Sequence, residues 1–325
     1  MRLNTELRET YSKFFAANSS ALQKIMYLYF KHYYEKENIE NDHESYLFVK
    51  GSIPIVLVAH LDTVFQFPPT ENEIFYDEAK NVMWSPRGLG ADDRAGILAI
   101  LELVKKGFRP YILLTQGEED GGQGALDFLQ SHPQAPESIH FLIELDRANR
   151  KDCVFYECDN RDFVNFISSF GFSETEGVFT DISLICPVWG IAGVNLSVGY
   201  FFEHSCTEFL NYNFLFETID KVSNILSSET KKYRYIEKKN SNVILNSIIC
   251  TKCAEPHNIT NMCLIEDENG ADDIWCISCL INSEKEFYYC AKCGKPILKN
   301  PKIKQKSICY ECRKENYEKR LKKRE

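Results

Sequence analysis

The chain has 325 residues, 44% of them hydrophobic and 13% aromatic, which is enough to bury one good-sized core and a small additional module. It has no run approaching the eighteen or so apolar residues of a membrane span, which argues against a transmembrane protein. The net charge of −9 hides an asymmetry. Residues 285–325 carry 14 Lys or Arg against 5 Asp or Glu, so this segment is +9 and residues 1–284 are −18.

Residues 3–34 predict two helices at the start of the chain. Aromatic side chains recur along this segment, and such a stripe is more often core packing than a ligand-binding surface. We therefore assign residues 1–40 to helices that belong to a larger catalytic domain, expected at residues 1–235. The aromatic positions are Tyr11, Phe14, Phe15, Tyr27, Tyr29 and Phe30.

Short apolar runs follow at 55–59, 111–115 and 141–143. Runs of this length are typical of buried parallel strands. They alternate with segments that predict helices, at 94–106, about 122–131 and about 206–227. The alternation predicts an α/β fold with three layers and a mostly parallel central sheet.

Five acidic or histidine-bearing motifs occur in the first two-thirds of the chain, most of them where an apolar run ends. They are His60-Leu-Asp62, Gly90-Ala-Asp92-Asp93-Arg94, Gly117-Glu118-Glu119, Glu144-Leu-Asp146 and His204-Ser-Cys-Thr-Glu208. Side chains at the carboxyl ends of parallel strands converge on one crevice. Two histidines and several carboxylates in one crevice predict a site for two zinc ions. Such ions, about 3.5–4 Å apart, polarise a carbonyl and activate a shared water, so the predicted reaction is amide hydrolysis.

Each motif also has a simpler interpretation. His60 could be a hydrogen-bonded histidine at a strand end, and Glu118-Glu119-Asp120 could be a solvated turn. Asp92-Asp93-Arg94 could cap and open the helix that follows. Asp146-Arg147 could be a surface ion pair. These interpretations together require five coincidences, so we favour the metal site.

The motif set resembles the co-catalytic zinc peptidases, the superfamily of peptidase T, glutamate carboxypeptidase and the single-domain zinc aminopeptidases. His-Leu-Asp-Thr-Val at 60–64 and Leu-Gly-Ala-Asp-Asp-Arg-Ala-Gly at 89–96 look most like peptidase T. The resemblance spans roughly residues 50–215. It implies that His60 and Asp146 bind one zinc ion, Glu119 and His204 bind a second, and Asp92 bridges both. Cobalt or manganese could replace zinc in such a carboxylate-rich site.

The same resemblance implies two catalytic roles beside the metals. Glu118 would be the general base that takes a proton from the bridging water. Asp62 would accept the other ring N–H of His60 and fix the tautomer of that histidine. The family also leads us to expect a cis peptide bond at Asp92–Asp93.

One departure from peptidase T concerns the segment between Asp146 and His204. In peptidase T and its nearer relatives a lid or dimerisation domain lies there, whereas only 57 residues (147–203) are present here. This is too short for a domain with its own core, so the layout is closer to the single-domain aminopeptidases. Tyr200 is a candidate oxyanion donor or, alternatively, a core aromatic residue. Asp181 resembles an acidic position near the metals of the single-domain enzymes.

A second region, which is rich in cysteine, begins near residue 246, after an expected linker at 236–245. It contains four Cys-x-x-Cys pairs, which are Cys250/Cys253, Cys276/Cys279, Cys290/Cys293 and Cys309/Cys312. Two such turns complete a closed tetrahedral zinc site, so residues 246–325 predict a double zinc ribbon with about two structural zinc ions. His257 or Cys263 could replace one ligand, and crossed pairing between the ribbons stays open. A disulfide scaffold or a redox motif is disfavoured, because no secretory signal or βαβ pattern accompanies the pairs.

The sequence therefore predicts a cytoplasmic two-zinc hydrolase of amide or peptide bonds, most simply an aminopeptidase or small-peptide exopeptidase. The alternatives are a deacylase acting on a non-peptide amide and a non-catalytic protein whose zinc ribbons bind a partner. The basic tail, which ends at Arg324, could bind an acidic protein or nucleic acid, or it could be a solvated helix.

Overall fold

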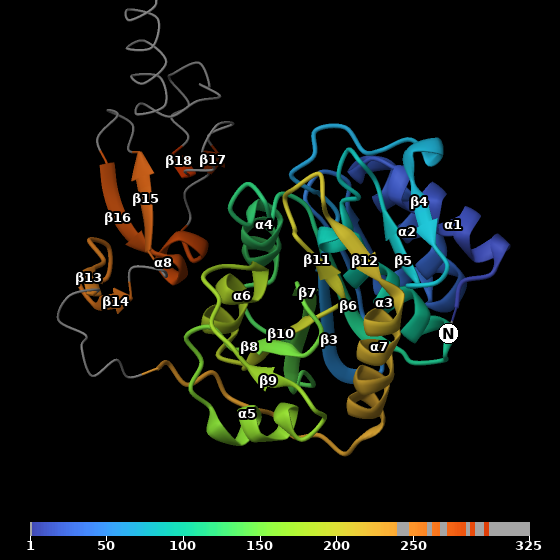
Figure 1. Cartoon of the computed structure of the whole chain (residues 1–325). Coiled ribbons are helices and arrows are strands. Elements are labelled where there is room, and N and C mark those ends of the chain that lie inside the picture. The colour runs from blue at the N-terminus through green and yellow to red at the C-terminus, as the bar shows by residue number, and fades with distance from the viewer. Residues whose placement is uncertain are drawn as a thin grey trace, which may run out of the picture. The chain divides into compact units, whose positions relative to one another are not determined.

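The computed structural model describes residues 2–238, 247–258, 262–266, 272–283, 287–289 and 296–298. The chain divides into two compact units (Figure 1). The first comprises residues 1–128 and 134–238, and the second comprises residues 129–133, which include the end of one helix of the first unit, and the residues from 239 onward. Among the described residues, no helix has both the length and the apolar character needed to cross a bilayer.

The first unit combines seven α-helices with two β-sheets in its described residues. Its helices are α1 (Thr5–Ala16), α2 (Ser19–Tyr33), α3 (Ala91–Lys105), α4 (Gln123–Ser131), α5 (Arg161–Ser168), α6 (Asp181–Trp189) and α7 (Tyr212–Ser227). Its strands are β1 (Ile39–Asp42), β2 (Tyr46–Val49), β3 (Ile53–His60), β4 (Phe75–Asp77), β5 (Val82–Trp84), β6 (Pro110–Thr115), β7 (Phe141–Arg147), β8 (Asp152–Val154), β9 (Ser173–Glu174), β10 (Gly193–Ser197), β11 (Tyr200–Phe201) and β12 (Phe209–Asn211).

The two predicted N-terminal helices are present as α1 and α2. Each begins at an asparagine whose side chain accepts a backbone N–H of the first turn, Asn4 from Leu7 and Asn18 from Ala21. Most of the aromatic stripe is buried, so its interpretation as core packing is confirmed.

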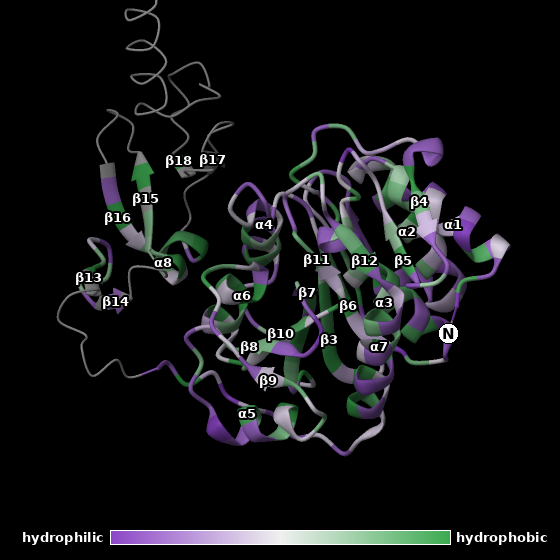
Figure 2. Cartoon of the chain, viewed as in Figure 1, coloured by the Kyte–Doolittle hydropathy of each residue, from purple (hydrophilic) through white to green (hydrophobic). Residues whose placement is uncertain are grey.

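The central sheet has the strand order β1-β2-β6-β3-β7-β10-β8-β9. Strands β6, β3, β7 and β10 run parallel to one another. Strand β1 is antiparallel to β2, β2 to β6 and β8 to β10, whereas β9 runs parallel to β8. The predicted α/β fold with a mostly parallel sheet is thus confirmed. Most residues of the middle strands are buried, because helices cover both faces of a parallel sheet. Figure 2 shows hydrophobic residues along β3 in green.

The connections between the parallel strands explain where the helices lie. The chain passes from β3 through α3 to β6 on one side, and then from β6 through α4 to β7 on the other side of β3. Right-handed crossovers in opposite directions place α3 and α4 on opposite faces of the sheet. The carboxyl end of β3 is therefore the switch point, where ligands of such sheets bind.

Gly96 lets helix α3 approach the sheet closely. A Cβ atom at this position would lie 2.0 Å from the backbone oxygen of Leu145 in β7, a distance that no side chain tolerates. The glycine in the Asp-Asp-Arg-Ala-Gly motif is therefore a packing requirement that sets the start of α3 against the end of β7.

A second, smaller antiparallel sheet has the order β11-β12-β5-β4. Its inner row of side chains is buried and comprises Met83, Leu210 and Tyr200. Strand β12 corrects one prediction, because the helix expected at about 206–227 begins only at Tyr212. Residues 209–211 pair with β5 and β11 instead, since their side chains alternate between the buried and exposed faces of this sheet.

The segment between Asp146 and His204 belongs to the first unit throughout. It supplies β8, β9 and β10 to the central sheet and helices α5 and α6. The chain continues as part of this unit up to Lys238, whose N–H donates to the backbone oxygen of Glu157. The first residues of the expected linker are therefore paired with the first unit.

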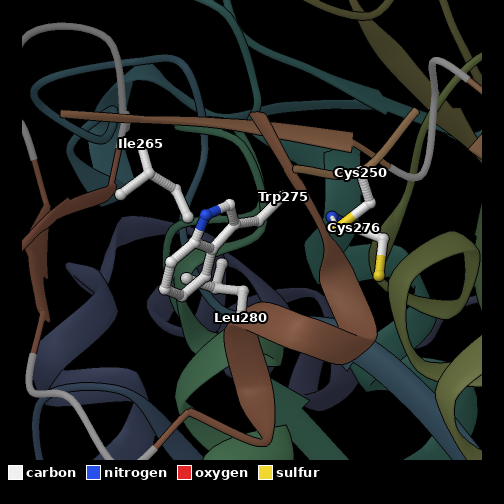
Figure 3. Packing of buried hydrophobic residues seen from close by; sticks show 5 residues of the cluster. All are labelled: Cys250, Ile265, Trp275, Cys276 and Leu280. Atoms are coloured by element: carbon white, nitrogen blue, oxygen red, sulfur yellow. Dashed lines mark hydrogen bonds between the residues drawn. The ribbon is translucent and has the colours of Figure 1, made fainter. Parts of the chain in front are cut away.

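The described part of the second unit is built from short strands and one helix. It contains β13 (Ser247–Ile249), β14 (Pro256–Asn258), β15 (Met262–Glu266), β16 (Asp272–Cys276), α8 (Ile277–Ile281), β17 (Phe287–Tyr289) and β18 (Pro296–Leu298). A small core gathers Trp275, Ile265 and Leu280 beside Cys250 and Cys276 (Figure 3).

Candidate metal centre

Side chains from three parallel strand ends meet at one edge of the central sheet. His60 is the last residue of β3 and pairs in register with Thr115, the last residue of β6. Glu119 follows β6 after a short turn, and Asp146 lies at the end of β7. The strand ends thus bring together residues that are far apart in sequence, as the sequence predicted.

Two groups of possible metal ligands share one carboxylate. The first contains His60, Asp92 and Asp146, and the second contains Asp92, Glu119 and His204. Within each group, one ligand atom per residue lies within 4.8 Å of the others. The groups match the two ligand sets that the sequence predicted.

Asp92 directs its two carboxylate oxygens toward different histidines. Oδ1 lies 3.2 Å from Nε2 of His60, and Oδ2 lies 3.1 Å from Nε2 of His204. Asp146 Oδ1 lies 3.5 Å from the same His60 nitrogen, and Glu119 lies 3.1 Å from the same His204 nitrogen. A carboxylate placed between two such groups can bridge two cations.

The neighbouring Asp93 performs the capping role that we considered as an alternative. Asp92 and Asp93 have non-helical backbone angles, so the regular part of α3 begins after them. The Asp93 Oδ1 accepts the N–H of Gly96 in the first turn of this part, and its Oδ2 accepts the N–H of His60. The expected cis peptide bond at Asp92–Asp93 is also present. The capping interpretation is thus correct for Asp93, while Asp92 faces the histidines.

Asp62 organises the turn that follows β6. Its carboxylate accepts the backbone N–H groups of Gly117, Glu118 and Glu119 at 2.8, 3.3 and 3.2 Å. His60 Nδ1 lies 3.1 Å from the backbone oxygen of Asp62 and 3.5 Å from its carboxylate. Asp62 therefore contacts the imidazole mainly through its main chain, and its side chain holds the turn that carries Glu118 and Glu119.

Glu118 lies beside the first ligand group without belonging to it. Its Oε2 is 4.0 Å from Nε2 of His60, and its side chain is largely buried. Burial raises the pKa of Glu118 to about 10 in the metal-free protein, which favours the protonated form. A carboxyl group with a strong affinity for a proton, next to paired metal ligands, is suited to proton transfer.

Excess negative charge dominates the electrostatics of the site. Burial raises the pKa of Glu119 to about 7 and that of Asp146 to about 6, with a further contribution from Asp92 in both cases. Hydrogen bonding to Asp92 raises the pKa of His204 to about 9. Burial alone would raise the pKa of Asp92, but the His204 and His60 imidazoles outweigh it and hold this pKa below its usual range.

This donor set fits a pair of divalent cations. Each group offers one imidazole nitrogen and two carboxylates, which are donors that zinc accepts in catalytic sites with an open position. Divalent cations would offset the buried negative charge that otherwise forces these acids to take up protons. The residues present thus suit the zinc ions that the sequence implied.

Two polar side chains support Asp146, and of these Thr180 was missed from sequence. Thr180 Oγ1 donates to Asp146 Oδ2 at 3.2 Å, and the Tyr200 hydroxyl donates to Asp146 Oδ1 at 3.3 Å. Tyr200 is buried, so it is a core aromatic residue whose hydroxyl holds a candidate ligand. Asp181 and Glu144 are also buried, and each has one oxygen without a hydrogen-bond partner.

We predict that the metal-free protein loses stability as the pH rises from about 5 to 7. Glu119, Asp146 and Asp181 have folded-state pKa values of about 7, 6 and 7, above those of the unfolded chain. The folded state therefore binds more protons than the unfolded state in this range, and the free energy of unfolding must fall with rising pH. The raised pKa of His204 acts in the same direction at higher pH.

Thermal unfolding of chelator-treated protein across this range tests that prediction. Added zinc should raise Tm more at pH 7 than at pH 5, because it binds deprotonated ligands. The substitution Glu119→Gln, which removes one titrating group, should flatten the pH dependence of the metal-free protein. A metal-free Tm that increases from pH 5 to 7 would contradict the electrostatic account.

The second unit contains a separate cluster of four thiols, from Cys250, Cys253, Cys276 and Cys279. Their Sγ atoms lie within 4.8 Å of one another. The predicted first ribbon set is thus brought together, and Cys263 is outside this cluster. The second predicted set, Cys290, Cys293, Cys309 and Cys312, lies outside the described residues, as does the basic tail.

Backbone N–H groups favour the charged form of one thiol in this cluster. Cys250 Sγ accepts the N–H of Cys276 at 3.2 Å. Such bonds outweigh burial and lower the pKa of Cys250 to about 6. His257 Nε2 lies 3.4 Å from Cys253 Sγ, so this histidine contacts a thiol of the cluster. A thiolate beside three further sulfurs is typical of a structural zinc site.

One known family matches part of the first unit. A family model described as Peptidase family M28 matches residues 49–162. This segment includes His60, Asp92, Glu119 and Asp146 but ends before His204. No curated protein matches the chain.

Several solved structures share the fold. Aminopeptidase PepT from Bacillus cereus is 13% identical, with a TM-score of 0.54, over 69% of this chain and 98% of that chain. A tripeptidase from Staphylococcus aureus is 15% identical, with a TM-score of 0.53, over 68% and 98%. The TET1 peptidase from Pyrococcus horikoshii is 15% identical, with a TM-score of 0.51, over 67% and 98%.

Proposed function

We propose that this chain, a metallopeptidase of the co-catalytic zinc superfamily, is a two-zinc aminopeptidase or small-peptide exopeptidase. The observation that carries the proposal is the placement of Asp92, whose two oxygens face His60 and His204 at 3.2 and 3.1 Å. A carboxylate in this position can hold two cations close enough to act on one carbonyl group. His60 and Asp146 would hold one cation, and Glu119 and His204 the other.

The bound zinc ions would polarise the scissile carbonyl and lower the pKa of a shared water. Glu118 would accept the proton of that water and donate it to the leaving amine. Asp62 keeps Glu118 in reach by binding the turn at 117–119. Thr180 and Tyr200 fix the orientation of Asp146, which limits the positions a ligand oxygen can take.

The solved structures that share the fold favour exopeptidase action over the cleavage of non-peptide amides. Their printed names are those of an aminopeptidase, a tripeptidase and a peptidase. The candidate base and all five candidate metal ligands are present in this chain, which disfavours an inert hydrolase fold. We also propose a cytoplasmic location, because thiolate zinc sites require reduced cysteines.

A screen of peptide and N-acyl substrate libraries with added zinc tests this proposal. Free N-terminal peptides should be hydrolysed from one end, and blocking the amino group should abolish cleavage by an aminopeptidase. Cleavage confined to N-acyl compounds would instead identify a deacylase. If the zinc-loaded wild-type protein cleaves neither library faster than Glu118→Ala, the proposal fails.

We further propose that the four thiols of Cys250, Cys253, Cys276 and Cys279 hold one structural zinc ion, and that the second cysteine set holds another. Replacing Cys276 with serine should remove one zinc ion per chain, because three thiols and a hydroxyl form a poorer tetrahedral site. Native mass spectrometry of the full chain measures the number of bound ions. Cys206→Ser, which changes an exposed cysteine outside the cluster, should retain the wild-type number. Equal zinc content in both variants would refute this site.

A further inference from the structure

Glu208 is a fully buried carboxylate that none of the proposed catalytic roles uses. It lies four residues after His204, immediately before β12, and its side chain is completely shielded from solvent. Burying a carboxylate is costly unless its oxygens accept hydrogen bonds. The partners of Glu208 therefore indicate what this residue does.

All three backbone donors to Glu208 belong to the segment that carries Asp92. Its Oε2 accepts the N–H of Gly90 at 2.5 Å and of Ala91 at 3.0 Å, and its Oε1 accepts the N–H of Asp92 at 3.3 Å. These partners are 116 to 118 residues away in the sequence. Three successive N–H groups directed at one carboxylate fix the path of the main chain and hence the position of Asp92.

Glu208 is also connected to His204, because both belong to the turn between β11 and β12. Residues 202–208 connect β11 to β12, and the Ser205 hydroxyl closes the turn on the backbone oxygen of Phe202 at 2.7 Å. The N–H of Glu208 donates to the backbone oxygen of Ser205 at 3.1 Å. His204 has a positive φ of 60° within this turn, a conformation that persists only when surrounding contacts hold it.

We propose that Glu208 is a positioning residue that sets the distance between the Asp92 carboxylate and the His204 imidazole. It links the loop of the bridging ligand to the turn of the second histidine, so it acts on two of the three ligands of the second metal position, Asp92 and His204. This inference rests on the proposed two-metal function. The charge of Glu208 favours the charged form of the buried Arg94, although burial lowers the pKa of this guanidinium.

Glu208→Gln tests the role, because it keeps the size of the side chain but replaces one acceptor oxygen with a donor. If the oxygen of the glutamine side chain accepts the N–H groups of Gly90 and Ala91, the NH2 group of that side chain faces the N–H of Asp92. Two donors then face each other, so Asp92 must move. A displacement of about 1 Å can cost on the order of 100-fold in rate. We expect kcat on a cleaved peptide to fall by roughly 10- to 100-fold, with KM changed by less than about twofold.

Cobalt-substituted full-length protein gives a readout that does not depend on activity. Cobalt bound by imidazole and carboxylates absorbs weakly, whereas cobalt bound by thiolates has intense charge-transfer bands, so the two kinds of site can be followed separately. Glu208→Gln should change the weak bands and leave the thiolate bands as in the wild type. Glu203→Gln removes a charge from an exposed residue of the same turn and should change neither the spectrum nor kcat.

Glu208→Asp covers the case in which Glu208→Gln does not fold. It keeps the charge but shortens the side chain by one methylene group, so a positioning role predicts a lower kcat and altered weak cobalt bands. Wild-type kcat and an unchanged spectrum in either folded variant would overturn the proposal. A loss of Tm with no change in kcat or spectrum would assign Glu208 to folding alone. If the wild type cleaves no peptide, the proposed function fails, but the cobalt spectra still test Glu208.

Discussion

Replacing Glu118 with glutamine should lower kcat by roughly 10²- to 10⁴-fold while the protein keeps its full zinc content. Glutamine has nearly the same shape but cannot take up a proton. Glu118 lies 4.0 Å from the nearest nitrogen of His60, outside both ligand groups, so its replacement removes no metal donor. Steady-state kinetics and metal analysis on the same preparation give both quantities.

The matched control for this substitution is Asp120→Asn. Asp120 lies two residues further along the same turn and is exposed. The control changes the local charge by the same amount and should leave kcat near the wild-type value. Comparable losses in both variants would mean that general charge at the turn matters. Wild-type activity in Glu118→Gln would remove the proposed base from the mechanism.

Replacing Asp92 with asparagine should abolish activity and also reduce metal binding. The amide retains one oxygen donor, while its NH2 group must face His60 or His204 in place of a ligand oxygen. A bridging role therefore predicts the loss of at least one zinc ion and a rate loss at least as large as for Glu118, on the order of 10³-fold. Titration with zinc, followed by calorimetry and native mass spectrometry, measures the number of sites and their affinities.

Asp220→Asn is the control for the bridging ligand. Asp220 is an exposed residue of α7 that pairs with Lys106 at 2.7 Å. Its substitution should leave both metal positions and kcat unchanged, because exposed ion pairs contribute little. If Asp92→Asn binds two zinc ions with wild-type affinity, Asp92 does not bridge them. The two substitutions thus separate the proton-transfer role of Glu118 from the metal-binding role of Asp92.

Much of the fold could be predicted from local patterns. The apolar runs that become β3, β6 and β7 lie in the middle of a parallel sheet. Nearly all of their residues are therefore buried, and these runs do not alternate between apolar and polar residues. The short strands of the second sheet were missed, because two or three residues give no readable period. For the same reason the predicted helix at about 206–227 included the residues of β12, although the observed helix begins at Tyr212.

The sequence by itself determined the order and the chemistry of the candidate ligands. His60 and Asp146 stand at strand ends, and parallel strands end at one edge, so their convergence follows from the pattern. The tertiary structure decided which groups hold those ligands in place. Glu208 reaches the Asp92 loop across 116 residues, and Tyr200 reaches Asp146 across 54. Such contacts depend on how strands and turns pack in space, and no local periodicity or spacing along the chain encodes them.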